Sequence, residues 1–171
     1  TFESLGSDFI PIAERSGVRL HIRPTDAFVQ SDRMMLRRIL QNILSNALRY
    51  TRHGGVLIGA RKRKDTVWID VWDTGIGINP DQIESIFDEF HRGPDAATHH
   101  SGGLGLGLSI VSRMTQALGH RLEVRSQPNT GTLFRLVVPV AETAVASTNS
   151  VQHRNEAPVY GLFHAKVLLI E

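Results

Sequence analysis

The chain has 171 residues, of which 41% are hydrophobic and 21% are charged, and its formal net charge is +2. This length and composition indicate one globular domain with some additional linker. The absence of cysteine excludes disulfides and thiolate zinc sites. No apolar run approaches the roughly 18 residues that span a bilayer, and nothing at the start of the given sequence resembles a signal peptide. The eight histidines show no metal-ligand spacing.

The first half of the chain predicts a strand, a long helix and a hairpin. Residues 19–24 alternate and end in Pro24, which is typical of a short strand. Asp32 is a suitable N-cap for the helix that follows, and Gly54-Gly55 is expected to end it. Its apolar positions recur at helical spacing: Leu36, Ile39, Leu40, Ile43, Ala47 and Tyr50. Residues 56–63 and 66–73 then predict two strands, and the basic run 61–64 between them is interpreted as a solvated hairpin tip rather than a nucleic-acid patch.

The second half predicts two helices, a second hairpin and a polar tail. A short helix is expected over 81–86, and a long polar loop over 87–103, of the kind that is usually functional. A helix over 106–118 is expected to stop at Gly119, and strands over 121–126 and 131–140 form a hairpin. The prediction is a mixed α/β domain over 1–141, a sheet of about five strands with about three helices on one face. A polar linker over 142–164 and a fresh strand over 165–171 follow.

Two amides on the long helix form the first candidate feature. Asn42 and Asn46 are four residues apart and therefore share one helix face, with Arg49 one turn further on. An amide oxygen can ligate Mg²⁺, which usually keeps water and phosphate ligands as well, and a neighbouring cation suits phosphate. Taken alone, two asparagines on a helix are more often simply solvated side chains.

The stretch "DTGIGI" forms the second feature. Asp73 ends an apolar strand, and Gly75 and Gly77 turn the chain sharply behind it. A carboxylate there can accept a hydrogen bond from an exocyclic amino group, while Ile76 and Ile78 offer apolar walls for a flat ring. A plain Asp-Gly turn is the alternative interpretation.

The remaining two features are "FDEFHRG" and "GGLGLGLSIV". In the first, Phe87 and Phe90 are spaced to anchor a loop on the core while Arg92 projects, although this stretch taken alone favours an amphipathic helix end. In the second, glycines precede a helix, which suits an anion site for phosphates or a simple hinge. It is neither a Walker A loop nor a dinucleotide fingerprint.

These four stretches, in this order, resemble the N box, first glycine box, F box and second glycine box of the ATP-binding catalytic domain of sensor histidine kinases. The resemblance covers about residues 20–139 and implies the family's Bergerat α/β sandwich. It also implies ATP and Mg²⁺ as cofactors, and transfer of the γ-phosphate to a histidine on a separate dimerisation domain in two-component signalling.

Carried over box by box, the resemblance gives each position a role. Asn46 would ligate Mg²⁺, with Asn42 beside it at the phosphates, and Arg49 stands where the family often has lysine. Tyr50 would lie against adenine, Asp73 would hold its amino group, and Arg92 would approach the γ-phosphate. The adenine wall and the phosphate lid would be formed by Gly75, Ile76, Gly77, Ile78 and Thr132, and by residues 93–103 with Gly103, Leu104, Gly105, Leu106, Gly107 and Leu108. Leu104 stands where threonine is more usual.

The resemblance also sets expectations for partners and location. None of the eight histidines is the phosphoacceptor, which in the family lies on a preceding helical domain of the same protein. The stretch 165–171 resembles the first strand of a receiver domain and suggests a hybrid kinase, so a receiver or response regulator is the expected partner. A monomeric, cytoplasmic domain of bacterial type is expected, without nucleic-acid or membrane contact of its own, in a parent that a membrane can anchor elsewhere.

Two other functions are consistent with the sequence. One is another ATPase or a serine kinase of the same superfamily, although the hydrolytic members need a glutamate one turn before the metal-binding asparagine, where Asn42 stands. The other is a regulatory module that binds nucleotide without turnover.

Overall fold

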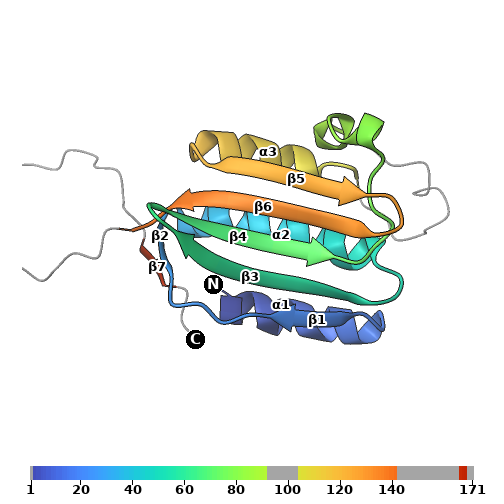
Figure 1. Ribbon diagram of the computed structural model, residues 1–171, viewed down its shortest axis with the longest axis horizontal. Coiled ribbons are helices and arrows are strands. Elements are labelled where there is room, and N and C mark those ends of the chain that lie inside the picture. Colours follow the sequence, from blue (N-terminus) through green and yellow to red (C-terminus); the bar gives the residue numbers. More distant parts are fainter. Residues whose placement is uncertain (1, 92–103, 142–165, 169–171) are drawn as a thin grey trace, which may run out of the picture.

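The computed structural model describes residues 2–91, 104–141 and 166–168 (Figure 1). The helices are α1 (Phe2–Arg15), α2 (Arg33–Tyr50) and α3 (Gly107–Ala117), with two short 3₁₀ turns, η1 (Pro80–Gln82) and η2 (Ser85–Phe87). The strands are β1 (Arg19–Ile22), β2 (Phe28–Gln30), β3 (Gly55–Arg63), β4 (Thr66–Asp73), β5 (Arg121–Gln127), β6 (Gly131–Pro139) and β7 (Lys166–Leu168).

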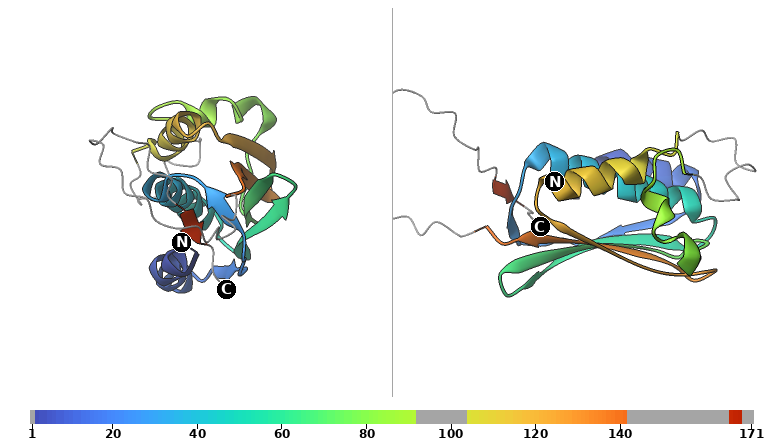
Figure 2. Two further views of the ribbon diagram at one scale, coloured as in Figure 1. Left: turned by 90° about the vertical axis from the view of Figure 1, so that its left-hand side faces the viewer. Right: turned by 90° about the horizontal axis from the view of Figure 1, so that it is seen from above.

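Five strands form one mixed sheet in the order β1-β3-β4-β6-β5. Only the β1–β3 pair is parallel, and the other three pairs are antiparallel. The three α-helices lie together on one face of this sheet, as the view from above shows (Figure 2). The predicted two-layer fold, with five strands and three helices on one face, is therefore confirmed.

Helix α2 lies at the centre of the helical layer and contributes much of the core. Asp32 caps it as predicted, because its Oδ1 accepts a hydrogen bond from the Met35 amide at 2.7 Å. The helix ends at Tyr50, earlier than Gly54-Gly55, because Thr51 adopts extended backbone and its hydroxyl donates to the Ala47 carbonyl at 2.7 Å. The core side of the helix is formed by Leu36, Ile39, Leu40, Ile43, Leu44, Ala47 and Leu48.

Two elements at the start of the chain were not predicted. Helix α1 buries an apolar stripe, and strand β2 pairs with β7 in a separate two-stranded sheet. The α1 stripe consists of Phe2, Leu5, Phe9 and Ala13, which recur at helical spacing. Pro11 lies inside the helix and interrupts the pattern on which a sequence-based prediction depends. Of the stretch predicted as a strand over 165–171, residues 166–168 form β7, which pairs with β2, and the others lie outside the described residues.

The short helix predicted over 81–86 is wrong, because two 3₁₀ turns occupy this stretch. Their N-caps, Asn79 and Glu84, make no side-chain capping hydrogen bond, so nothing there favours a continuous α-helix.

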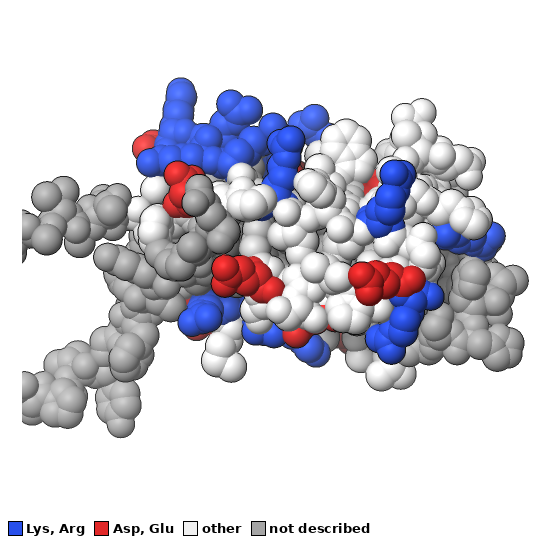
Figure 3. All heavy atoms as spheres, turned by 90° about the horizontal axis from the view of Figure 1, so that it is seen from below, with Lys and Arg blue, Asp and Glu red and all other residues white. Residues whose placement is uncertain are grey.

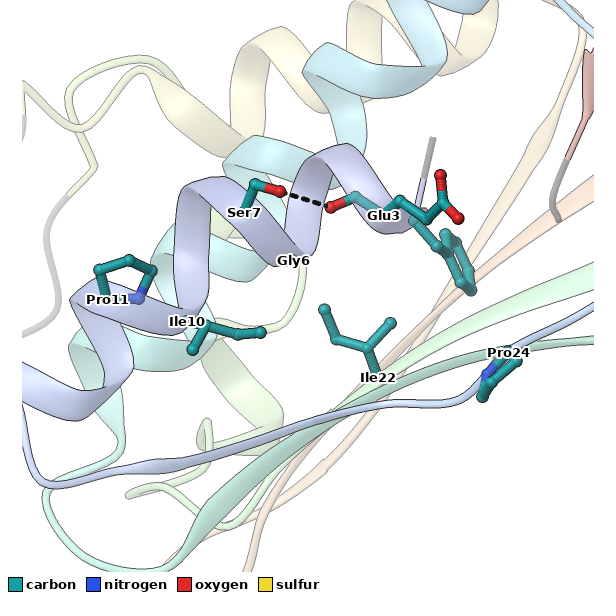
Figure 4. A pocket seen from close by; sticks show the side chains of 8 residues that line it. Glu3, Gly6, Ser7, Ile10, Pro11, Ile22 and Pro24 are labelled. Carbon is teal, nitrogen blue, oxygen red and sulfur yellow. Dashed lines mark hydrogen bonds between the residues drawn. The ribbon is translucent and has the colours of Figure 1, made fainter. Parts of the chain in front are cut away.

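A pocket of about 430 Å³ opens between α1 and β1 (Figure 4). Gly6 on α1 faces Ile22 on β1 there, and apolar side chains of both elements line the opening. None of its lining residues is among those that carry the predicted chemistry. Within the ranges described, no helix is long and apolar enough to cross a membrane.

Candidate functional site

The carboxylate of Asp73 lies at the end of β4, with only 4% of the residue exposed. Its Oδ1 accepts hydrogen bonds from the Gly75 amide at 2.8 Å and from the Thr132 amide at 3.3 Å. Burial raises the pKa of Asp73, and the two amide hydrogen bonds partly oppose that rise because they stabilise the charged form. The strand end therefore holds a fixed acidic group at the corner that the sequence predicted.

The two glycines after Asp73 allow the turn to pack between α2 and the β5–β6 turn. A side chain on Gly75 would lie 2.4 Å from the Tyr50 carbonyl oxygen, and one on Gly77, whose φ is +69°, would lie 2.1 Å from the Gln127 carbonyl oxygen. The Ile76 amide donates to that Tyr50 carbonyl at 3.2 Å. Only glycine fits at either position, and the Ile76–Tyr50 hydrogen bond holds the turn against the end of α2.

Thr132 faces Asp73 in the register of β4 and β6. It is buried, and its hydroxyl lies 2.9 Å from the hydroxyl of Ser126 on β5. Ser126 also accepts a hydrogen bond from the Ile78 amide at 2.8 Å. Ser126 therefore connects the Asp73 turn to β5 and β6, a role that sequence reasoning missed because one serine in a strand carries no distinctive signal.

The asparagine face of α2 meets the beginning of α3. A Cβ on Gly107, the first residue of α3, would lie 3.4 Å from Oδ1 of Asn42 and 3.9 Å from Nδ2 of Asn46. Asn42 donates through Nδ2 to the Arg38 carbonyl at 3.0 Å, which leaves Oδ1 as the atom on the Gly107 side. The structure thus brings together two of the four predicted features, the asparagine pair and the second glycine box. They meet at the N-terminal end of α3, where the first backbone amides have no partner within the helix.

Tyr50 and Arg49 complete the α2 part of the site. Tyr50 is half-buried at the end of the helix, where its carbonyl meets the Asp73 turn, and Arg49 is exposed. In the second glycine box, Leu104 is 75% exposed, Leu106 is the N-cap of α3, and Leu108 packs against the core. Arg92 and Gly103 lie outside the described residues.

A hydrogen bond joins the F box to the second glycine box. The Phe90 amide donates to the Gly105 carbonyl at 3.1 Å, and both residues have positive φ, +61° and +71°. A Cβ on Gly105 would lie 2.8 Å from the His91 carbonyl oxygen, so this approach requires glycine. An ion pair between Glu89 and Arg113 ties the same stretch to α3. We refer to the Phe90–Gly105 contact as the neck.

The prediction that both phenylalanines anchor this stretch is half right. Phe87 packs against the core, whereas Phe90 is 67% exposed. The physical reason is the positive φ of Phe90, which turns the backbone toward Gly105 and directs the side chain away from the core.

The donor set permits one kind of metal site. No group of three or more His, Cys, Asp or Glu side chains is arranged to hold a metal ion among the residues described. The amide oxygens of Asn42 and Asn46 are hard donors, and Mg²⁺ commonly takes one or two protein ligands and completes its shell with phosphate oxygens and water. Asn42 already directs its oxygen to the Gly107 side, and a flip of the Asn46 amide would bring its oxygen there too, so the pair could hold Mg²⁺ that arrives with a phosphate ligand.

The sandwich fold, the buried acidic corner and the glycine-rich helix start are typical of a nucleotide-binding ATPase domain. The chain belongs to the family of histidine kinase-, DNA gyrase B-, and HSP90-like ATPases, whose model matches residues 31–142.

Individual relatives are sensor kinases. The chain is 34% identical to the autoinducer 2 sensor kinase/phosphatase LuxQ of Vibrio parahaemolyticus, over 100% of this chain and 21% of LuxQ. It is 37% identical to the sensor histidine kinase WalK of Bacillus subtilis, over 68% of this chain and 20% of WalK. The chain spans about a fifth of the length of these curated relatives.

Solved structures agree with this placement. The full-length ShkA structure in complex with AMPPNP matches with a TM-score of 0.70 and 32% identity, over 82% of this chain and 29% of that one. The mycobacterial sensor histidine kinase MprB matches with a TM-score of 0.68 and 26% identity, over 81% of this chain and 94% of that one. The family resemblance inferred from the four boxes is confirmed.

Proposed function

We propose that this domain binds ATP with Mg²⁺ and presents the γ-phosphate to a histidine on a separate helical dimerisation domain. The observation that carries the proposal is the approach of Gly107 to Asn42 and Asn46, because it joins a helix start suited to anions with an amide pair suited to Mg²⁺. The buried Asp73 corner adds a polar acceptor for a base.

At the base end, Asp73 is the proposed acceptor for the amino group of adenine. Its Oδ1 is already held by two amides, so Oδ2 is the atom that we assign to the base. Gly75 and Gly77 hold the turn in place, and the proposed walls of the base site are Tyr50, Ile76, Ile78 and Thr132.

At the phosphate end, Asn46 is the proposed Mg²⁺ ligand, with Asn42 beside it. The proposed cations are Arg49 and Arg92, and the backbone amides over 103–108 are the proposed hydrogen-bond donors to the phosphates. Bound Mg²⁺ would neutralise charge on the phosphates. The protein groups hold the triphosphate in line with the acceptor. The histidine nitrogen forms a bond to the γ-phosphorus, the bond between that phosphorus and the bridging oxygen breaks, and ADP leaves.

Isothermal titration calorimetry with Asp73→Asn tests the base site. The substitution removes a charged acceptor, and a hydrogen bond to a charged group contributes about 1.5–3 kcal/mol. We therefore expect ATP affinity to fall by more than tenfold, with Asp65→Asn, at the exposed β3–β4 turn, as the matched control. The wild type should also prefer ATP to inosine triphosphate, which has an oxo group at this position, and Asp73→Asn should reduce that preference. Retained affinity and preference would contradict the assignment.

A transfer assay tests the reaction. The chain incubated with ATP and Mg²⁺ should form no acid-labile phosphohistidine of its own, but should phosphorylate a separately supplied histidine-bearing dimerisation domain. Phosphohistidine on this chain would contradict the proposal. Nucleotide binding without transfer to any cognate domain would instead identify a regulatory module. A receiver domain or response regulator is the proposed destination of the phosphoryl group.

A further inference from the structure

The face of the sheet opposite the helices is open to solvent in the described part of the chain (Figures 1 and 2). On β4 its side chains are Trp68, Asp70 and Trp72, because the intervening residues point into the core. The strand register places Arg61, Gly59 and Leu57 of β3 beside them on one side, and Val137, Arg135 and Leu133 of β6 on the other. The side chains on this face are therefore different from those assigned to the proposed nucleotide site.

In the half of this face around Trp68, the aromatic ring and the charged side chains already interact with one another. The Arg135 guanidinium stacks over Trp68 at 4.1 Å, and those of Arg63 and Arg61 lie at 5.5 and 5.7 Å from the ring. Arg135 also forms two hydrogen bonds with Asp70, at 2.7 and 2.9 Å. Cations cover this ring, so it offers little surface to a partner.

The half around Trp72 is different. Trp72 is 53% exposed, and its neighbour Leu57 is 37% exposed. Leu133 faces Trp72 from β6 and is partly exposed. We call Leu57, Trp72 and Leu133 the Trp72 patch. Over the residues described, no cation stacks on the Trp72 ring. An exposed tryptophan between two leucines is typical of a protein-binding surface, since tryptophan often dominates the binding energy.

The charges around the Trp72 patch are mostly positive. The face carries two acidic side chains, Asp70 and Glu123, and seven arginines; Arg61, Arg63, Arg121 and Arg135 belong to its Trp68 half. The other three, Arg19, Arg23 and Arg125, are exposed and lie near the Trp72 patch, because Arg125 is opposite Leu133 and the other two flank His21, the partner of Leu57. We call Arg19, Arg23 and Arg125 the arginine rim. Both acids are engaged by arginines. The whole chain has a formal charge of only +2, so positive charge is concentrated here. Further Lys and Arg side chains gather toward the β3–β4 hairpin, at the Trp68 end of the sheet (Figure 3).

We propose that the Trp72 patch and its arginine rim bind an acidic segment of a partner protein, with an apolar side chain of the partner packed on Trp72. The occupant's acidity follows from the excess of arginine, and its apolar anchor follows from the leucines on both sides of the ring. A nucleic acid fits less well, because the second tryptophan is covered and only one ring is free to stack on bases. The proposal goes beyond the nucleotide function and does not depend on it.

The test is an NMR titration of the full ¹⁵N-labelled chain with a blocked octapeptide that has two leucines between three glutamates on each side. We expect saturable shifts at Leu57, at the Trp72 indole and at Leu133, with weaker binding at higher salt. Trp72→Ala should weaken binding by about tenfold, as expected for a hot-spot residue. Met34→Ala, at a residue that is 82% exposed at the start of α2, should leave it unchanged.

A second variant separates charge from packing. Arg125 lies opposite Leu133 in the register, so Arg125→Glu keeps the tryptophan and reverses one charge of the rim. This variant should bind the glutamate peptide more weakly than the wild type does, and should bind more tightly a peptide in which lysines replace the glutamates. The proposal is overturned if the glutamate peptide causes no shifts at millimolar concentration, or if Trp72→Ala does not weaken it. It is also overturned if the lysine peptide binds the wild type equally well, or if only oligothymidine or phosphatidylserine vesicles shift these signals.

Discussion

Asp73 and Thr132 meet across the antiparallel pair of β4 and β6, where the Thr132 amide donates to Oδ1 of Asp73 at 3.3 Å. The carboxylate is thereby held by a strand remote in sequence as well as by Gly75 of its own turn. This arrangement fixes a charged group in a buried position before any ligand arrives, which is the kind of preorganisation that a binding site requires.

The first prediction concerns the pH dependence of stability. Burial raises the pKa of Asp73 above its ordinary value of 3.8, so the folded chain takes up this proton at a higher pH than the unfolded chain does. The free energy of unfolding contributed by this group therefore falls as pH rises from about 3.8 through the folded-state pKa. Asp73→Asn removes this loss and should gain stability relative to the wild type across that window. Urea denaturation of both proteins at several pH values measures it, and parallel profiles would contradict the burial argument.

The second prediction concerns the space between α2 and α3. Gly107→Ala places a methyl group 3.4 Å from Oδ1 of Asn42, where we propose that phosphate and Mg²⁺ bind. Alanine favours a helix over glycine by up to about 1 kcal/mol, so the free energy of unfolding should not fall. We expect affinity for ATP with Mg²⁺ to drop by about tenfold in calorimetry. Gln116→Ala, at an exposed position later in α3, is the control and should bind normally. Normal binding by Gly107→Ala would place the phosphates elsewhere.

The third prediction compares two glycines with nearly equal backbone angles. Gly77 and Gly119 have φ of +69° and +65°, but a Cβ on Gly77 would lie 2.1 Å from the Gln127 carbonyl oxygen, and one on Gly119 would meet nothing within 4 Å. Left-handed strain costs about 1–2 kcal/mol for alanine, and a clash with backbone adds about 1–3 kcal/mol. Gly119→Ala should therefore lower the free energy of unfolding by about 1 kcal/mol, and Gly77→Ala by about 3 kcal/mol. Equal losses in chemical denaturation would exclude the clash.

The fourth prediction concerns the arginine over Trp68. The side chain of Arg135 is 8% exposed and forms two hydrogen bonds with Asp70, whereas Arg121 is 68% exposed in its pair with Glu123. Arg135→Ala leaves Asp70 without this partner and should cost about 2–3 kcal/mol, because breaking a buried pair is costly. Arg121→Ala should cost less than about 1 kcal/mol, as exposed pairs usually do. In chemical denaturation, the double variant Asp70→Ala with Arg135→Ala should lose less free energy of unfolding than the sum of the losses in the two single variants.

The elements that the sequence predicted are those with an uninterrupted pattern. Helix α2 has a clear cap at Asp32 and a regular apolar stripe, and the two hairpins have clear turns. Helix α1 has a stripe as regular, from Phe2 to Ala13, but Gly6 and Pro11 within it are residues that weaken a helix prediction. Here burial of the stripe against the core outweighed propensity.

The candidate site divides in the same way. The residue types and their order predicted Asp73, Asn42 and Asn46, because each follows from local spacing on a strand end or a helix face. The approach of Gly107 to the asparagines depends on how α3 packs on α2, and the Phe90–Gly105 neck depends on two positive φ angles. Periodicity carries no information on either, so only the structure reveals them.

The neck has a consequence for how this fold can vary. It joins the two ends of the intervening stretch, residues 91–104, through a single backbone hydrogen bond, so the positions of both ends do not depend on the stretch itself. Doubling the length of a closed loop costs only about 0.6 kcal/mol. Insertions or deletions between these two residues are therefore expected to leave the Asp73 corner and the start of α3 where they are. The length of the chain between Phe90 and Gly105 can therefore vary while the rest of the site keeps its geometry.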